Sequence, residues 1–270
     1  MVEVFDMELS TNNVRKRILD MAYRCGRNVH LGGSLSMADI LTVLYRDVMN
    51  IKVSDMQWDD RDRFILSKGH CVLALYAVMA ELGIMGEEEV GSYMQDGSLY
   101  GSHPVMDIRH GIECSSGSLG QGVSMAVGIA KAAKLTNRSY NVYTLVGNGE
   151  CDEGSVWEAF MLAGQWKLDN LTIIIDNNRI QSDGKSEDII DLSNISQRLD
   201  GFGLKVIEIN GHDEVEILQA FRSSFENTSK VIVCNSVKGK GVSFMENNNE
   251  WHHNRLIEET YKKAIEEIGA

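Results

Sequence analysis

Residues 142–184 read VYTLVGNGECDEGSVWEAFMLAGQWKLDNLTIIIDNNRIQSDG, and the rest of the chain is organised around them. The segment opens with an apolar, β-branched run at 142–146 and closes with a second one at 171–175, as buried strands do. Glycines break the first run, and a helical spacing of apolar residues separates the two. A strand, a helix and a strand in this order form a βαβ unit whose strands are parallel. The sequence therefore predicts an α/β fold with a mostly parallel sheet flanked by helices.

Polar side chains follow both predicted strands, where each one ends. Because the strands are parallel, these side chains meet at one edge of the sheet, where such folds bind ligands. Mg²⁺ takes oxygen ligands partly from protein and partly from water and phosphates, and glycines followed by a helix N-terminus favour an anion. One interpretation is a site for a metal and a diphosphate; ordinary turn residues are the other, and spacing alone leaves both open. The residues are Asn148, Glu150 and Asp152, then Asp176, Asn177 and Asn178.

The same residues carry a resemblance to enzymes that use thiamine diphosphate (ThDP). Their motif starts Gly-Asp-Gly and ends Asn-Asn, and this chain has Gly147-Asn148-Gly149 and later Asn177-Asn178. The likeness covers nearly the whole chain and implies the ThDP-binding fold of the diphosphate-binding (PP) type. One departure is that Asn148 stands where the family has its metal-binding aspartate. The flanking segments resemble the transketolase branch, especially its separate N-terminal subunits: EG at 153–154, WEA at 157–159 and KLDNL at 167–171.

The resemblance implies a role for several residues. Reaction-site residues would be His30 and His103, and Glu153 resembles a glutamate that links the cofactor sites across the family's subunit interface. From the residues alone, His70 is also interpretable as a helix cap, and His103 as a structural neighbour of Pro104. The metal, Mg²⁺ or else Ca²⁺ or Mn²⁺, would be held by Asn148, Asn178 and the carbonyl of Ile180. The cofactor-binding residues would be His70, Gly117, Leu119, Gly149, Glu150, Asn178 and His252.

Composition is that of a soluble globular protein. The chain has 270 residues, of which 43% are hydrophobic and 24% charged, so we expect a single domain over 1–270. A net charge of -13 argues against nucleic-acid binding through a general basic surface. The five cysteines are scattered without a C-x-x-C pair, which indicates reduced thiols used in packing. We expect a cytoplasmic protein, because the acidic N-terminus is no signal peptide and no apolar run is long enough to span a membrane.

The remaining segments continue the α/β alternation. Residues 30–36 are predicted to be a glycine-rich loop, and Ser10 or Thr11 to cap the first helix. The Lys238-Gly-Lys-Gly241 segment lacks the spacing of a P-loop. Helices are predicted near 10–25, 37–48, 72–82, 124–133, 189–199 and 214–225 and at the C-terminal end, and strands within 61–70 and at 204–209 and 230–237. Three further histidines, His110, His212 and His253, are predicted to be surface residues.

The function that the resemblance implies is transfer of a two-carbon ketol unit from a ketose phosphate to an aldose. We expect the pyrimidine-binding domain to come from a C-terminal transketolase subunit, with two of each chain in a heterotetramer that binds neither nucleic acid nor membrane. One alternative is a 2-oxo-acid decarboxylating ThDP subunit, but the histidines at 30, 70, 103 and 252 favour transketolase. The other is a non-catalytic scaffold or regulatory subunit that has lost metal binding through Asn148. The donor and acceptor sugars are not fixed by the sequence.

Overall fold

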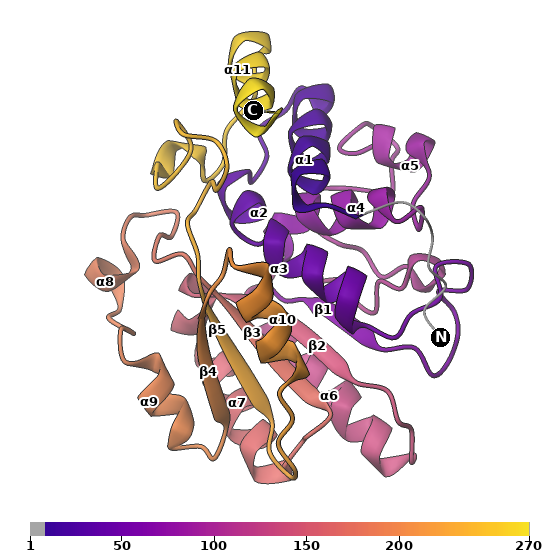
Figure 1. Cartoon of the computed structure of the whole chain (residues 1–270), viewed down its shortest axis with the longest axis vertical. Helices are drawn as coiled ribbons and strands as arrows, with labels where there is room; N and C mark the ends of the chain where they lie inside the picture. Colours follow the sequence, from indigo (N-terminus) through magenta and orange to yellow (C-terminus); the bar gives the residue numbers. More distant parts are fainter. Residues whose placement is uncertain (1–8, 270) are drawn as a thin grey trace.

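The computed structural model describes residues 9–269 and contains one five-stranded sheet in which all neighbouring strands are parallel (Figure 1). The strand order is β1-β2-β3-β5-β4. The predicted α/β fold with a parallel sheet is confirmed. The strands are β1 (Arg63–Leu66), β2 (Val142–Gly147), β3 (Leu171–Asn177), β4 (Lys205–Asn210) and β5 (Lys230–Asn235).

Helices cover both faces of this sheet, and others extend beyond its carboxyl edge (Figure 1). None of those in the described residues is long and apolar enough to cross a membrane. Their bounds are α1 (Thr11–Cys25), α2 (Gly32–Ser36), α3 (Ala38–Val43), α4 (Val72–Glu81), α5 (Glu87–Gly91), α6 (Gln121–Leu135), α7 (Gly154–Trp166), α8 (Ser186–Ile189), α9 (Ile195–Asp200), α10 (Glu214–Arg222) and α11 (Glu258–Gly269).

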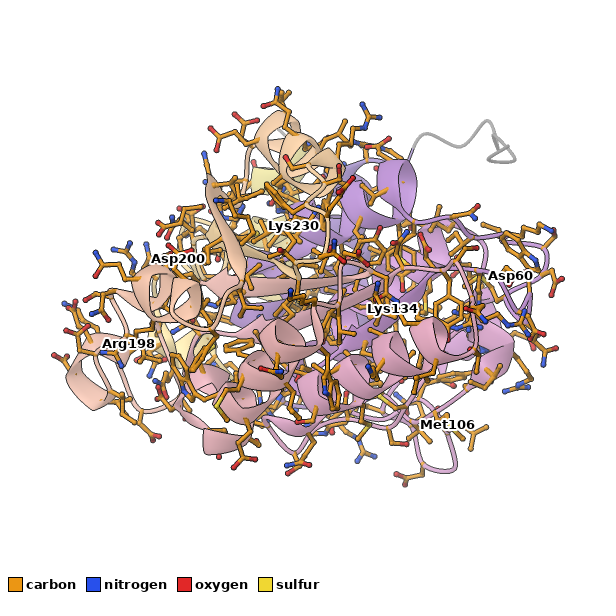
Figure 2. All side chains as sticks on the ribbon, turned by 90° about the horizontal axis from the view of Figure 1, so that it is seen from below. Asp60, Met106, Lys134, Arg198, Asp200 and Lys230 are labelled. Carbon is orange, nitrogen blue, oxygen red and sulfur yellow. The ribbon has the colours of Figure 1, made fainter. Side chains whose placement is uncertain are left out.

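Two hydrophobic layers follow from the alternation of side chains along the strands. On β3, Ile174 packs into the layer that contains α1, α3, α4 and α10, while Ile173 and Ile175 pack into the layer of α6, α7 and α9. All three isoleucines are at most 1% exposed, so each stabilises the fold by about 1.5–3 kcal/mol through burial. Figure 2 shows the side chains seen from below, with Lys134 of α6 and Asp200 of α9 labelled. Lys134 forms a salt bridge of 2.5 Å with Asp169, which follows α7.

The register of the central strands places the predicted site residues together. Gly147 of β2 pairs with Asp176 of β3, and Asn177 of β3 pairs with Asn235 of β5. The residues that follow β1, β2, β3 and β5 therefore emerge at one edge of the sheet. This confirms the prediction that the polar residues after the two central strands share an edge.

Close backbone approach explains why the helix after 115–122 is rich in small residues. A Cβ on Gly122 would lie 2.6 Å from the Cα of Ser67, and one on Gly120 would lie 2.2 Å from Ser155 Oγ. Gly120 also has φ 81°, which favours glycine. The small residues let α6 pack directly against the end of β1, beside the site edge.

Some predicted boundaries were wrong, and local hydrogen bonds explain two of them. Residues 32–36 form a helical turn instead of a loop, because Ser34 Oγ donates to the His30 carbonyl (2.7 Å) and Ser36 Oγ donates to that of Gly33 (3.0 Å). The helix predicted at 189–199 is broken into α8 and α9, since Asp191 accepts from the backbone N–H of Ser193 in a local turn (2.9 Å). The helix at 37–48 continues after α3 as a π-helix over Leu44–Val48. The N-cap of α1 is Ser10, as predicted.

Candidate functional site

A cavity of about 480 Å³ opens at the carboxyl edge of the sheet. Of the predicted site residues, only Glu153 does not line it; this side chain is exposed next to the start of α7. Lys68, Lys238, Gln181, Ser182 and the backbone of Gly33 and Gly147 also line the cavity and were not predicted. The predicted residues that line it are His30, His70, His103, Gly117, Leu119, Asn148, Gly149, Glu150, Asn178, Ile180 and His252.

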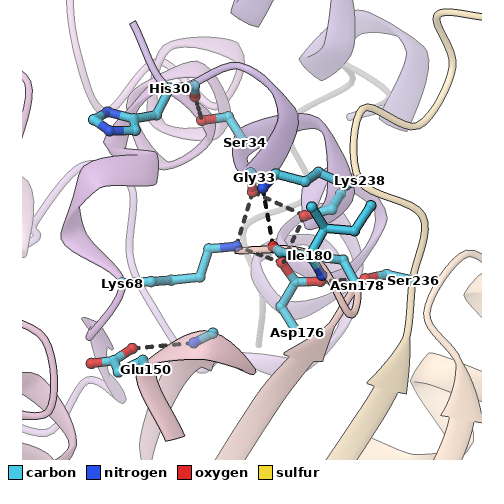
Figure 3. Close-up of polar contacts among 12 residues, drawn as sticks. His30, Gly33, Ser34, Lys68, Glu150, Asp176, Asn178, Ile180, Ser236 and Lys238 are labelled. Atoms are coloured by element: carbon cyan, nitrogen blue, oxygen red, sulfur yellow. Dashed lines mark hydrogen bonds and ion pairs between the residues drawn. The ribbon is translucent and has the colours of Figure 1, made fainter. Parts of the chain in front are cut away.

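The base of the cavity rests on a buried ion pair between Lys68, which follows β1, and Asp176 near the end of β3 (Figure 3). The Nζ–Oδ2 distance is 2.5 Å, and the two side chains are 2% and 0% exposed. Burial alone would raise the pKa of Asp176, but the Lys68 ammonium and hydrogen bonds from serine hydroxyls hold it below its usual value. Asp176 also accepts from Nδ2 of Asn178 at 2.9 Å. The pair therefore fixes the amide of Asn178.

The predicted metal-binding oxygens lie together beside this pair. Asn178 Oδ1 accepts from the N–H of Ile180 at 3.1 Å. When the Asn148 amide oxygen accepts from the Gly149 N–H (3.2 Å), its nitrogen lies 3.3 Å from Asn178 Oδ1. Within residues 9–269, no three His, Cys, Asp or Glu side chains are grouped to hold a metal, and the predicted ligands here are amides and a carbonyl. Such neutral oxygens suit a hard cation that obtains its negative ligands elsewhere.

Lys238 follows β5 and reaches into the cavity from the opposite side. Its residue is 1% exposed, and its ammonium donates to the Ile180 carbonyl (3.0 Å), the Gln181 carbonyl (3.3 Å) and His252 Nδ1 (2.8 Å). In the described part of the chain it forms no salt bridge with a carboxylate. Burial lowers its pKa to about 8. A buried ammonium that contacts only neutral groups favours an anionic ligand. The sequence signal, a lysine directly after a strand of a parallel sheet, was masked by the search for P-loop spacing.

Four histidines form one wall of the cavity. The ring of His30 lies 5.0 Å from that of His70, 6.3 Å from His103 and 5.3 Å from His252, between centroids. Burial, together with the neighbouring groups, lowers the pKa of His30 to about 3, of His70 to about 4 and of His252 to about 3. These rings are therefore neutral near pH 7, and each can donate one hydrogen bond and accept another. His253, predicted as a surface residue, is exposed, yet its ring lies 4.5 Å from that of His30.

The predictions for two other histidines were wrong. His110 is only 7% exposed, and Nδ1 bonds to Asp107 at 2.9 Å while Nε2 lies 3.2 Å from Glu89. His212 is also largely buried and is hydrogen-bonded on both ring nitrogens. Neither position has an apolar pattern that would have indicated burial, because the contacts that cover them come from distant segments.

Glu150 and two glycines shape the cavity wall. Both carboxylate oxygens of Glu150 are occupied, because they accept from Ser67 Oγ (2.5 Å) and from the N–H groups of Gly120 (2.8 Å) and Gly147 (3.1 Å). Burial raises the pKa of this carboxyl. A Cβ on Gly149 would lie 2.8 Å from Gln181 Cγ, and one on Gly117 would lie 2.7 Å from the His103 ring. The glycines thus keep the backbone close to the space that a ligand would occupy.

Comparison with known proteins gives a consistent result. The family described as the transketolase thiamine diphosphate binding domain matches residues 8–270. One of the named subunits of the apulose-4-phosphate transketolase of Phocaeicola vulgatus is 39% identical, over 99% of this chain and 95% of that protein. The 6-deoxy-6-sulfo-D-fructose transketolase subunit SqwG of a Clostridium species is 38% identical, over 97% of this chain and 96% of that protein. The solved transketolase of Leishmania mexicana superposes with a TM-score of 0.88 at 30% identity, and this chain covers 40% of its length.

Proposed function

The chain belongs to the transketolase family, whose thiamine diphosphate binding domain it carries, and from this premise we propose that it forms, as a single domain, the cofactor-binding subunit of a split enzyme that transfers a two-carbon ketol unit between sugars. The observation that carries the proposal is the cavity, which joins a buried ammonium without a carboxylate partner, neutral histidines and a cluster of neutral oxygens. These groups match a diphosphate with its cation better than a neutral ligand.

The diphosphate of ThDP would be held by Lys238, His70, His252 and the N–H of Gly149, which converge on the cavity. ThDP itself supplies the stabilised carbanion that carries the ketol unit. The protein's task is to hold the cofactor, exclude water and place hydrogen-bonding groups beside the reacting sugar. His30 and His103 are the proposed sugar-facing groups, because they lie across the cavity from the amide cluster and are free of charge near neutral pH.

A divalent cation, Mg²⁺ or else Ca²⁺ or Mn²⁺, would bind Asn148 and Asn178 through their side-chain oxygens and Ile180 through its carbonyl. Lys238 now donates to that carbonyl at 3.0 Å, so cation binding requires the ammonium to turn away, toward the diphosphate. Metal and diphosphate would therefore bind together, each relieving the charge of the other.

Replacing Asn148 with aspartate tests the metal assignment. Asn148→Asp adds a negative charge opposite the cation, so the Mg²⁺ concentration for half-maximal ThDP binding should fall about tenfold for a coupling of about 1.4 kcal/mol. Metal titrations at fixed ThDP would measure this in both proteins. Unchanged or weaker binding in the aspartate variant would show that residue 148 does not contact the metal.

Replacing His103 with alanine tests the sugar-facing assignment. His103→Ala should lower kcat/KM by roughly 10- to 1000-fold, because one to a few kcal/mol of transition-state stabilisation are lost, while ThDP affinity stays nearly intact. Steady-state kinetics and cofactor titration on the same preparation would separate the two effects. Reduced thermal stability with unchanged kinetics per folded molecule would instead make His103 a structural neighbour of Pro104.

The proposal includes a partner subunit that carries the pyrimidine-binding domain, with two copies of each chain related by a two-fold axis. Relatives that this chain covers almost completely are named as transketolase subunits, which supports the division into two chains. Glu153 lies outside the cavity, where it would be available to the interface between cofactor sites. We place the enzyme in the cytoplasm, with sugars or sugar phosphates as substrates.

A further inference from the structure

His212 lies outside the cavity but is bonded to the backbone of the segment that enters it. The pairing of β4 with β5 ends at Asn210 and Asn235, and the last backbone bond runs from the Gly211 N–H to the Asn235 carbonyl (2.8 Å). Beyond this point β5 has no strand neighbour on that side. The N–H of Val237 instead donates to Nε2 of His212 at 2.8 Å. The ring continues the ladder by one residue.

The protonation state of this ring follows from its two partners. A backbone N–H can only donate, so Nε2 is the acceptor and Nδ1 carries the proton. Nδ1 lies 2.8 Å from Oδ2 of Asp39 on α3, which accepts that proton in a hydrogen bond. Asp39 is in turn ion-paired with Arg15 of α1, and these two side chains are 7% and 9% exposed. The ring is therefore held in one tautomer by two buried charges on the helical layer.

The residue next to Val237 is Lys238, the ammonium of the cavity. Its backbone carbonyl accepts from the N–H of Asn247 (2.8 Å), and the following Gly239 N–H donates to the Gly32 carbonyl (2.9 Å). Gly32 also leaves room for the lysine side chain, since a Cβ there would lie 3.0 Å from Lys238 Cγ. These bonds anchor the segment after Lys238, whereas His212 is the side chain that anchors it immediately before.

We propose that His212 is a positioning residue for the anion site: by accepting the Val237 N–H it sets the path of Lys238 and so the place of its ammonium beside Ile180 and His252. The inference rests on the proposed function, because it assigns to Lys238 a diphosphate ligand. It adds a chain of contacts, from α1 and α3 through the imidazole to the cavity, that no residue lining the cavity provides.

The test compares two substitutions at this position. In His212→Gln, the terminal amide carries one acceptor and one donor, as the ring does; in His212→Phe, the ring volume remains without either. Inorganic pyrophosphate with Mg²⁺, titrated calorimetrically into the full-length chain, reports on the anion site. We expect His212→Phe to bind pyrophosphate about tenfold more weakly and His212→Gln to stay within about threefold of the natural protein.

The matched control is His110→Phe. His110 is a buried histidine that is likewise bonded on both ring nitrogens, but its partners are Asp107 and Glu89 and it does not line the cavity. It should lose thermal stability without losing pyrophosphate affinity. If His212→Phe does not fold, His212→Asn replaces it, because its shorter amide leaves the Val237 N–H unbonded and the same weakening is expected.

Two results would overturn the inference: a folded His212→Phe or His212→Asn with unchanged pyrophosphate affinity, or an equal loss in His110→Phe. Failure of the natural protein to bind pyrophosphate at all would refute the proposed function, and the inference with it. Normal binding by the natural protein and by every variant would refute the inference alone.

Discussion

Ketol transfer is expected to be absent when this chain is assayed alone and to appear when the partner subunit with the pyrimidine-binding domain is added. The physical reason lies in the cavity, where Glu150 is the one carboxylate among the described lining residues. Its oxygens already accept three hydrogen bonds, so it is not free to activate the cofactor. The acid that this chemistry requires has to come from another chain.

A coupled assay with a panel of ketose donors would measure turnover by each chain separately and by the mixture. Light scattering on the mixture should give the mass of two copies of each chain. The matched control is the mixture without ThDP, which should be inactive. Robust, ThDP-dependent turnover by the purified single chain would contradict the prediction.

Loss of Lys68 is expected to be the most destabilising single substitution at the site. Lys68→Met leaves Asp176 as a buried carboxylate without its cation, and removal of one partner of such a pair costs about 3–5 kcal/mol of unfolding free energy. Urea denaturation in the absence of cofactor would measure it. Cofactor must be left out because Lys68 also lines the cavity.

The double variant Lys68→Met with Asp176→Asn provides the control. It removes both charges and keeps an amide that can bond to Ser36 and Asn178, so we expect it to be more stable than Lys68→Met alone. A single variant that loses less than about 1 kcal/mol would show that Asp176 does not depend on the ammonium.

The fold was predictable where one local pattern determines structure. The runs at 142–146 and 171–175 are β-branched and apolar, and parallel pairing carries the residues after them to one edge without further information. The break between α8 and α9 was less accessible, because it depends on one Asp191 bond that competes with the helix. Boundaries of this kind depend on single contacts more than on periodicity.

The site divides in the same way. Residues with a motif around them, such as Asn148 and His70, were placed correctly at the cavity. Lys68 and Asp176 were not paired in advance, because they lie on different strands and meet only when β1, β2 and β3 assemble. Lys238 was missed for a related reason: its meaning comes from where β5 ends, and no local spacing records that.

The central claim is that this chain holds the diphosphate of ThDP, and calorimetric titration of ThDP into the assembled complex, with and without Mg²⁺, tests it most directly. The account predicts one ThDP bound per copy of this chain, a requirement for the cation, competition by pyrophosphate, and weaker binding in Lys238→Met, which removes the ammonium while keeping the side-chain length. Absence of ThDP binding, or binding that is indifferent to the cation, to pyrophosphate and to residue 238, would contradict it and favour a non-catalytic scaffold.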